Sequence, residues 1–187
     1  MGIFDKFKKK NTGMQQAEHM DNELLKIVNI VSSGNIEIMD SAGQCVENTA
    51  GYYNDHIDDY QSRGLSNQEE MSFLQWIGCI DLLMKNHYVC ECDCKEDKGE
   101  FLYAVNSLRQ ISEFSIDIDG EWLDETQSVP QWCGTLDEKW KKSDCVMAAF
   151  DIDSDSYVMF PCKKGDIETL SALASRFGYR IDYVKNM

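Results

Sequence analysis

The chain has 187 residues, of which 43% are hydrophobic and 11% aromatic, enough for one domain with an appendage or for two small domains. Its charge is strongly negative, because 18 basic residues face 33 acidic ones and leave a formal net charge of −15. Such a field repels phosphate backbones. We therefore expect no nucleic-acid partner, and instead a basic protein partner or cations.

The first ten residues carry the opposite charge. They contain four lysines and one aspartate, a local charge of +3, so the remaining 177 residues carry −18. Ile3, Phe4 and Phe7 add a small apolar stripe. We predict a flexible basic leader over residues 1–12. A contact between this leader and an anionic membrane surface is left open.

The sequence indicates a cytoplasmic protein. Met1–Lys10 is charged and lacks a secretory apolar region, and no run approaches the roughly 18 apolar residues of a membrane span. Eight cysteines in 187 residues are too few for a disulfide scaffold. We therefore expect no membrane span, and free thiols in a reducing compartment.

Residues 13–86 are predicted to form a helical N-terminal region. Apolar residues recur at helical spacing over 14–32, and 47–62 favours a polar helix with an aromatic stripe. Residues 34–46 contain two glycines and show no clear preference.

The most apolar helix of this region follows a capping-box motif. Ser66 and Glu69 have the Ser-x-x-Glu spacing in which each side chain bonds the other residue's backbone amide. The residues that follow present one wide apolar face: Phe73, Leu74, Trp76, Ile77, Ile80, Leu82, Leu83 and Met84. This pattern predicts a buried helix capped by Ser66.

Residues 87–187 are predicted to form an α+β domain. Strands are indicated by alternation or by short apolar runs, and helices by a period of 3.6 residues. The expected elements are a strand over 87–94, a helix over 99–112, a hairpin over 115–123 around Asp119-Gly120, a helix from Pro130 or Thr135, strands over 145–152 and 156–162, a helix over 166–177 ended by Gly178, and a strand over 179–183.

The order of these elements predicts the α+β fold class with a ferredoxin-like antiparallel sheet. The pattern β-α-(α)-β-β-α-β is that of the split βαβ arrangement. We expect about four strands, with the helices over 99–112 and 166–177 on one face of the sheet. The N-terminal helices then form an extension.

Three aspartates occupy the turn between the two central strands. Asp151, Asp153 and Asp155 alternate, and carboxylates at positions i and i+2 of a strand can share a cation. The segment resembles the first motif of haloacid-dehalogenase-like phosphotransferases, yet only 36 residues follow Asp151 where that fold needs a long domain. A metal-dependent hydrolase or phosphotransferase that uses these three acids is the alternative interpretation.

The favoured interpretation gives the aspartates no chemistry. An EF-hand loop would need Gly where Ser156 stands and Glu where Cys162 stands. Asp and Ser side chains commonly bond their own backbone in turns. We therefore predict a tight hairpin whose acids stabilise the turn and present negative charge. The predicted partner-binding residues are Asp151, Asp153, Asp155 and Tyr157.

Other candidate ligands are weaker. Cys90, Cys92 and Cys94 alternate on one strand at about 7 Å, whereas sulfurs on one zinc lie about 4 Å apart, so we predict metal-free and mostly buried thiols. His56 and Asp59 share a helix face without a second pair of ligands. No P-loop, nucleophile elbow or zincin motif occurs, and we predict no cofactor.

The stretch Phe150–Phe160, with Asp-Ser-Asp-Ser-Tyr at 153–157, precedes a capped helix and Gly178. In this it resembles the bacterial domain-of-unknown-function family 6630, over roughly residues 66–184. The resemblance implies a cytoplasmic bacterial protein and supplies no catalytic residues. The favoured function is a non-enzymatic interaction module of the inhibitor or immunity type, which binds a basic partner.

Overall fold

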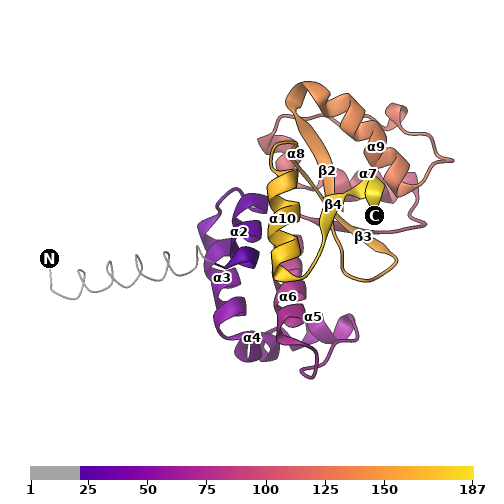
Figure 1. Cartoon of the computed structure of the whole chain (residues 1–187). Helices are drawn as coiled ribbons and strands as arrows, with labels where there is room; N and C mark the ends of the chain where they lie inside the picture. Colours follow the sequence, from indigo (N-terminus) through magenta and orange to yellow (C-terminus); the bar gives the residue numbers. More distant parts are fainter. Residues whose placement is uncertain (1–21) are drawn as a thin grey trace, which may run out of the picture.

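The structure is a computed structural model that describes residues 22–187. Its first half is helical: α2 (Glu23–Val31), α3 (Ile36–Glu47), α4 (Thr49–Asp55), α5 (Ile57–Ser62) and α6 (Met71–Lys85). Its second half holds β1 (Cys90–Asp93), α7 (Lys98–Asn106), α8 (Arg109–Glu113), η1 (Gly120–Trp122), α9 (Val129–Lys139), η2 (Trp140–Ser143), β2 (Cys145–Phe150), β3 (Ser156–Lys163), α10 (Ile167–Phe177), β4 (Ile181–Tyr183) and η3 (Val184–Asn186). Figure 1 shows α2–α6 on one side of the sheet and α7 and α9 on the other.

Asparagine caps fix where the first two helices begin. Asn22 has an extended backbone, and its side chain accepts a hydrogen bond from the amide of Leu24 at 2.9 Å, so α2 begins at Glu23. The predicted leader over 1–12 and the part of the predicted helix before Asn22 lie outside the described residues. Asn35 caps α3 in the same way, which makes most of 34–46 helical.

The predicted capping box at Ser66 is wrong. The helix begins at Met71, and its N-cap residue Glu70 makes no side-chain cap bond. Ser66 Oγ instead accepts a hydrogen bond from the amide of Gln68 at 3.3 Å, within a turn that precedes the helix. The motif therefore orders the approach to α6 rather than its first turn.

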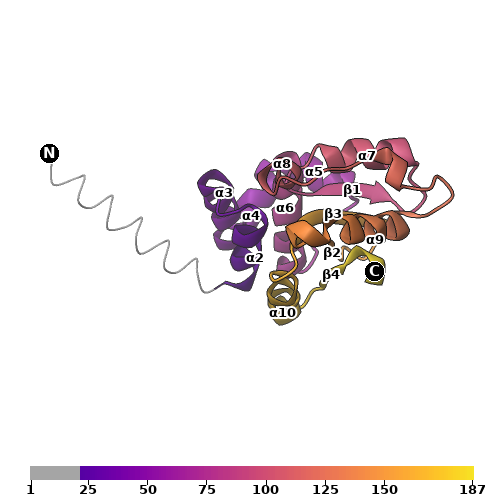
Figure 2. The ribbon, with the colours of Figure 1, turned by 90° about the horizontal axis from the view of Figure 1, so that it is seen from above.

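The four strands form one antiparallel sheet in the order β1-β3-β2-β4, which can be followed from β1 to β4 in Figure 2. In register, Cys92 lies opposite Tyr157, and Phe150 lies opposite Val158. These pairings confirm the α+β class and the antiparallel sheet.

The ferredoxin-like arrangement is not what the sheet shows, because β4 pairs with β2 rather than with β1. β1 and β2 run parallel with β3 between them, and β3 and β4 run parallel with β2 between them. The connection from β1 to β2 and the connection from β3 to β4 cross the sheet in the same direction. The strands from which they start, β1 and β3, run in opposite directions. Right-handed crossovers then place their helices on opposite faces, not on one face as predicted.

Two hydrophobic clusters show that both faces of the sheet are covered. Val146, Ala148 and Phe150 belong to a cluster shared with α2, α3, α6 and α10. Cys145, Met147 and Ala149 belong to another, shared with α7 and α9. The whole of β2 is buried, as its continuous apolar sequence predicts. The first cluster joins the N-terminal helices to the sheet across residue 86.

The predicted hairpin over 115–123 is also wrong. The chain forms the short helix η1 there, and the side chain of Asp119 accepts from the amide of Glu121 at 2.9 Å. Asp119-Gly120 therefore starts a helical turn instead of reversing a strand. Within residues 22–187, no helix has the length and apolar character needed to cross a bilayer.

Candidate functional site

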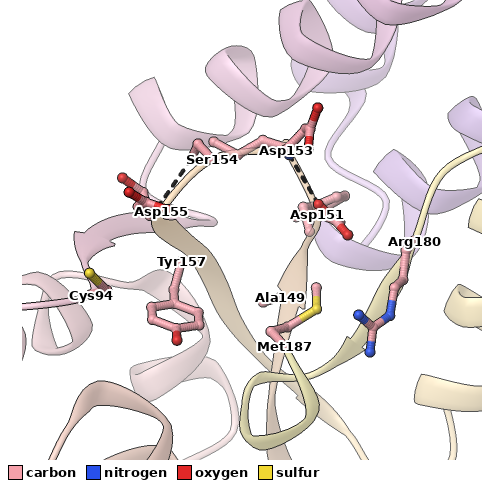
Figure 3. Close-up of a pocket in the computed structure, with 12 residues that line it drawn as sticks. Cys94, Ala149, Asp151, Asp153, Ser154, Asp155, Tyr157, Arg180 and Met187 are labelled. Atoms are coloured by element: carbon pink, nitrogen blue, oxygen red, sulfur yellow. Dashed lines mark hydrogen bonds between the residues drawn. The ribbon is translucent and has the colours of Figure 1, made fainter.

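The loop between β2 and β3 forms one wall of a groove of about 410 Å³. Figure 3 shows its lining: the loop itself, Arg180 ahead of β4, Cys94 after β1, and Met187 at the C-terminus. All four strands thus contribute to the groove, which lies at one end of the sheet. The predicted site residues Asp151, Asp153, Asp155 and Tyr157 all line this groove.

Asp151 fixes the base of the loop through three hydrogen bonds. Its amide donates to the carbonyl of Arg180 at 3.0 Å, and its carbonyl accepts from Trp76 Nε1 at 2.9 Å. Its carboxylate Oδ1 accepts from the amide of Asp153 at 3.0 Å. The turn-stabilising acid is therefore Asp151, which bonds the amide two residues ahead as an Asx turn does.

Trp76 connects the loop to the core. Its side chain is 0% exposed, lies edge-on to Phe150 at 5.3 Å between ring centroids, and stacks on Tyr179 at 4.7 Å. Because α6 delivers this indole from the helical half of the chain, the loop is held by residues far away in sequence. The apolar spacing predicts Trp76 as a core residue but gives no sign of its bond to the loop.

Asp153 and Asp155 are the exposed acids of the loop. Asp153 has a left-handed backbone with φ +56°, and Ser154 Oγ accepts from the amide of Ser156 at 3.1 Å. Among residues 22–187, neither carboxylate has a hydrogen-bond or ion-pair partner. The loop therefore holds two unneutralised charges on a backbone that local hydrogen bonds keep in shape.

The three carboxylates do not converge on one point. Asp151 and Asp155 lie at opposite ends of the loop, and the carboxylate of Asp153 at its tip points away from both (Figure 3). The left-handed residue at 153 breaks the strand alternation that would have aligned positions i and i+2. Within the described range 22–187, no group of three His, Cys, Asp or Glu side chains is arranged to hold a metal ion.

Arg180 is the cation that lines the groove, and its charge is already engaged. Its Nη2 donates to Asp182 Oδ2 at 2.9 Å and to the carbonyl of Asn186 at 2.8 Å. Burial tends to raise the pKa of Asp182, but hydrogen bonds from Asn186, Arg180 and the Tyr183 amide outweigh it and hold the pKa below its usual value. Arg180 thus braces β4 and η3 rather than neutralising the loop. The sequence gives no signal for this role.

The other candidate metal ligands, the three cysteines of 90–94 and His56, lie apart and have separate surroundings. Cys90 and Cys92 are buried, whereas Cys94 is half-buried in the groove wall. His56 stacks on Tyr52 and its Nδ1 bonds the carbonyl of Tyr52 at 3.0 Å, while Asp59 pairs with Lys85. His56 and Asp59 therefore serve separate structural contacts.

Fold and groove together define an α+β protein whose antiparallel sheet carries an acidic loop at one end, between its two central strands. The chain belongs to the family described as domain of unknown function (DUF6630), whose family model matches residues 23–184. The family assignment made from the sequence is confirmed, and the match begins in α2, well before residue 66. Comparisons with curated proteins and with solved structures gave no match.

Proposed function

We propose that this protein is a non-enzymatic interaction module that binds a basic surface of another protein with the loop over residues 151–157. The observation that carries the proposal is the pair of exposed carboxylates of Asp153 and Asp155, which have no cationic partner within residues 22–187. Charge-assisted hydrogen bonds to Lys or Arg are the strongest contacts that such groups make.

The surroundings of the loop support this type of contact. The chain beyond its first ten residues carries −18, a field that accelerates encounter with a basic partner. Tyr157 and Met187 line the same groove and offer apolar and aromatic contact beside the charges. Tyrosine and methionine are enriched at protein interfaces, whereas isolated acids are not. The groove therefore combines charge with a contact surface.

An inhibitor or immunity role, in which the module blocks a basic enzyme, is one form of this function. We also propose that the protein meets its partner in the cytoplasm; the eight free cysteines support this, since disulfides are rare in reducing compartments. A metal-dependent hydrolase or phosphotransferase has no geometric support, since the three carboxylates do not converge.

The test is quantitative capture from a lysate of the native host. The baits are the full chain, Asp153→Asn/Asp155→Asn, and the control Asp55→Asn/Asp58→Asn, which makes the same charge change at exposed aspartates outside the groove. We expect a basic protein that is retained by wild type and control and is lost from the loop variant. Equal retention by all three baits, or equal loss from both variants, would refute the proposal.

A further inference from the structure

A second groove, larger and more apolar than the first, lies between α2, α3 and α10. Its volume is about 530 Å³, and Ile30 of α2, Ile36 and Met39 of α3, and Leu173 of α10 line it. Ile36 is 70% exposed at its rim. Apolar side chains gathered around a concave surface mark a place where another apolar segment binds.

The α3 side of this groove is acidic. Glu37 and Asp40 are exposed one turn apart on α3, and Asp40 lines the groove. Within residues 22–187, neither has an ion-pair partner. The groove's lysine, Lys26, already pairs with Glu23 at 3.6 Å. An occupant with apolar side chains flanked by positive charge would fit both the lining and the rim.

The sequence of the first ten residues has that chemistry. Ile3, Phe4 and Phe7 supply the apolar side chains, and lysines at 6, 8, 9 and 10 supply the charge. No lysine or arginine occurs between residue 10 and Asn22, so the positive charge of the N-terminal segment is concentrated beside the aromatic residues.

The chain length allows this segment to reach the groove. Eleven residues separate Lys10 from Asn22, and they can span up to about 36 Å when extended. α2 begins directly after Asn22, forms one wall of the groove, and is about 14 Å long. A tether of this kind gives an effective concentration in the millimolar range, so a weak contact is still populated.

We propose that residues 1–10 bind in the groove between α2, α3 and α10 of the same chain. Ile3, Phe4 and Phe7 contact the apolar lining, and the neighbouring lysines lie near Glu37 and Asp40. The contact covers the exposed side chain of Ile36 and neutralises part of the acidic rim. It does not depend on the function of the loop over 151–157.

The test places a photo-crosslinking benzoylphenylalanine at position 4 of the full chain, and at position 7 in a second variant. After irradiation at two protein concentrations tenfold apart, crosslinked peptides are mapped by mass spectrometry. We expect crosslinks within one chain to Ile36, Met39 or Leu173, with a yield independent of concentration. Ile36→Ser should lower that yield several-fold, while the control Met71→Ser, at a residue 65% exposed outside the groove, should leave it unchanged.

Each other outcome overturns the proposal. Crosslinked dimers whose yield rises with concentration would assign the groove to a second copy. Crosslinks to residues 151–157, or no crosslink from either position, would show that the groove does not hold the leader. Sedimentation with phosphatidylglycerol vesicles, without groove crosslinks in their absence, would assign the leader to a membrane surface.

Discussion

Replacing Trp76 by Phe tests how the helical half of the chain holds the acidic loop. The change removes the hydrogen bond from the indole N–H to the carbonyl of Asp151, which costs about 0.5–1.5 kcal/mol of stability. It also leaves a small cavity, which costs roughly 1–2 kcal/mol more. A total of about 1.5–3.5 kcal/mol corresponds to a fall in melting temperature of about 3 to 14 °C for a chain of this size. Calorimetry measures that fall.

Trp140→Phe is the matched control, because the indole of Trp140 is also buried, at 2% exposed, and donates to the carbonyl of Asp117 at 2.8 Å. It belongs to the cluster on the other face of the sheet. Both variants should lose similar stability, but hydrogen exchange of the amides at 151–157 should accelerate only in Trp76→Phe. Unchanged exchange there, or the same acceleration in both variants, would refute the anchoring role of Trp76.

Three further predictions concern thiols, pH and metals. Cys94 is the half-buried thiol of the groove, so Ellman's reagent should react with one cysteine rapidly in the native protein, and Cys94→Ser should abolish that fast phase. Burial raises the pKa of Asp137, outweighing the bonds from the Met147 amide and Lys185, so its ionisation costs stability as pH rises through the raised value. The melting temperature of Asp137→Asn relative to wild type should therefore increase from about pH 4 to about pH 7, and a constant or falling difference would contradict this. Millimolar Mg²⁺ or Ca²⁺ should leave the wild-type melting temperature unchanged; a rise of several degrees that Asp153→Asn abolishes would indicate a metal site.

The sequence predicts an element correctly where its local pattern agrees with the tertiary packing. The apolar run at 145–150, followed by turn residues and a second run, predicts the β2–β3 pair found in the sheet. The end of α10 is likewise predicted, since Gly178 adopts φ +98° there. In both cases the residues that decide the structure are neighbours in the chain.

Local sequence patterns did not predict the structure where contacts between residues far apart in the chain determine the topology. The order of elements does not specify whether β4 joins β1 or β2, and that choice moves α10 to the other face of the sheet. α10 packs there against α2, and Arg176 pairs with Glu23 at 2.8 Å, a contact across most of the chain. The helical character of 34–46 is not evident from sequence because the segment contains two glycines, and one of them, Gly43, lies within α3 and lowers its helix propensity. The buried side chains of Ile38, Ala42 and Cys45 favour the helix through packing.

In the candidate site, too, local features were predictable from the sequence and contacts from distant residues were not. The spacing of the three aspartates predicts an acidic loop, and all three line one groove. The distinction between an Asx turn at Asp151 and free carboxylates at Asp153 and Asp155 depends on the left-handed backbone at 153. The contributions of Trp76 and Arg180 come from other elements, so no motif near the loop reveals them.

Binding of a basic partner by the loop over 151–157 can be measured directly by a nuclear magnetic resonance titration of the full chain with hexalysine at low ionic strength. We predict that the amide resonances of residues 151–157 shift at the lowest peptide concentrations. Asp153→Asn/Asp155→Asn should weaken that binding about fivefold, as expected for two exposed ion pairs of about 0.5 kcal/mol each, while Asp55→Asn/Asp58→Asn should change it less than about twofold. Shifts spread evenly over the acidic surface, or equal losses of affinity in the two variants, would show that the loop is not the binding site for a basic partner.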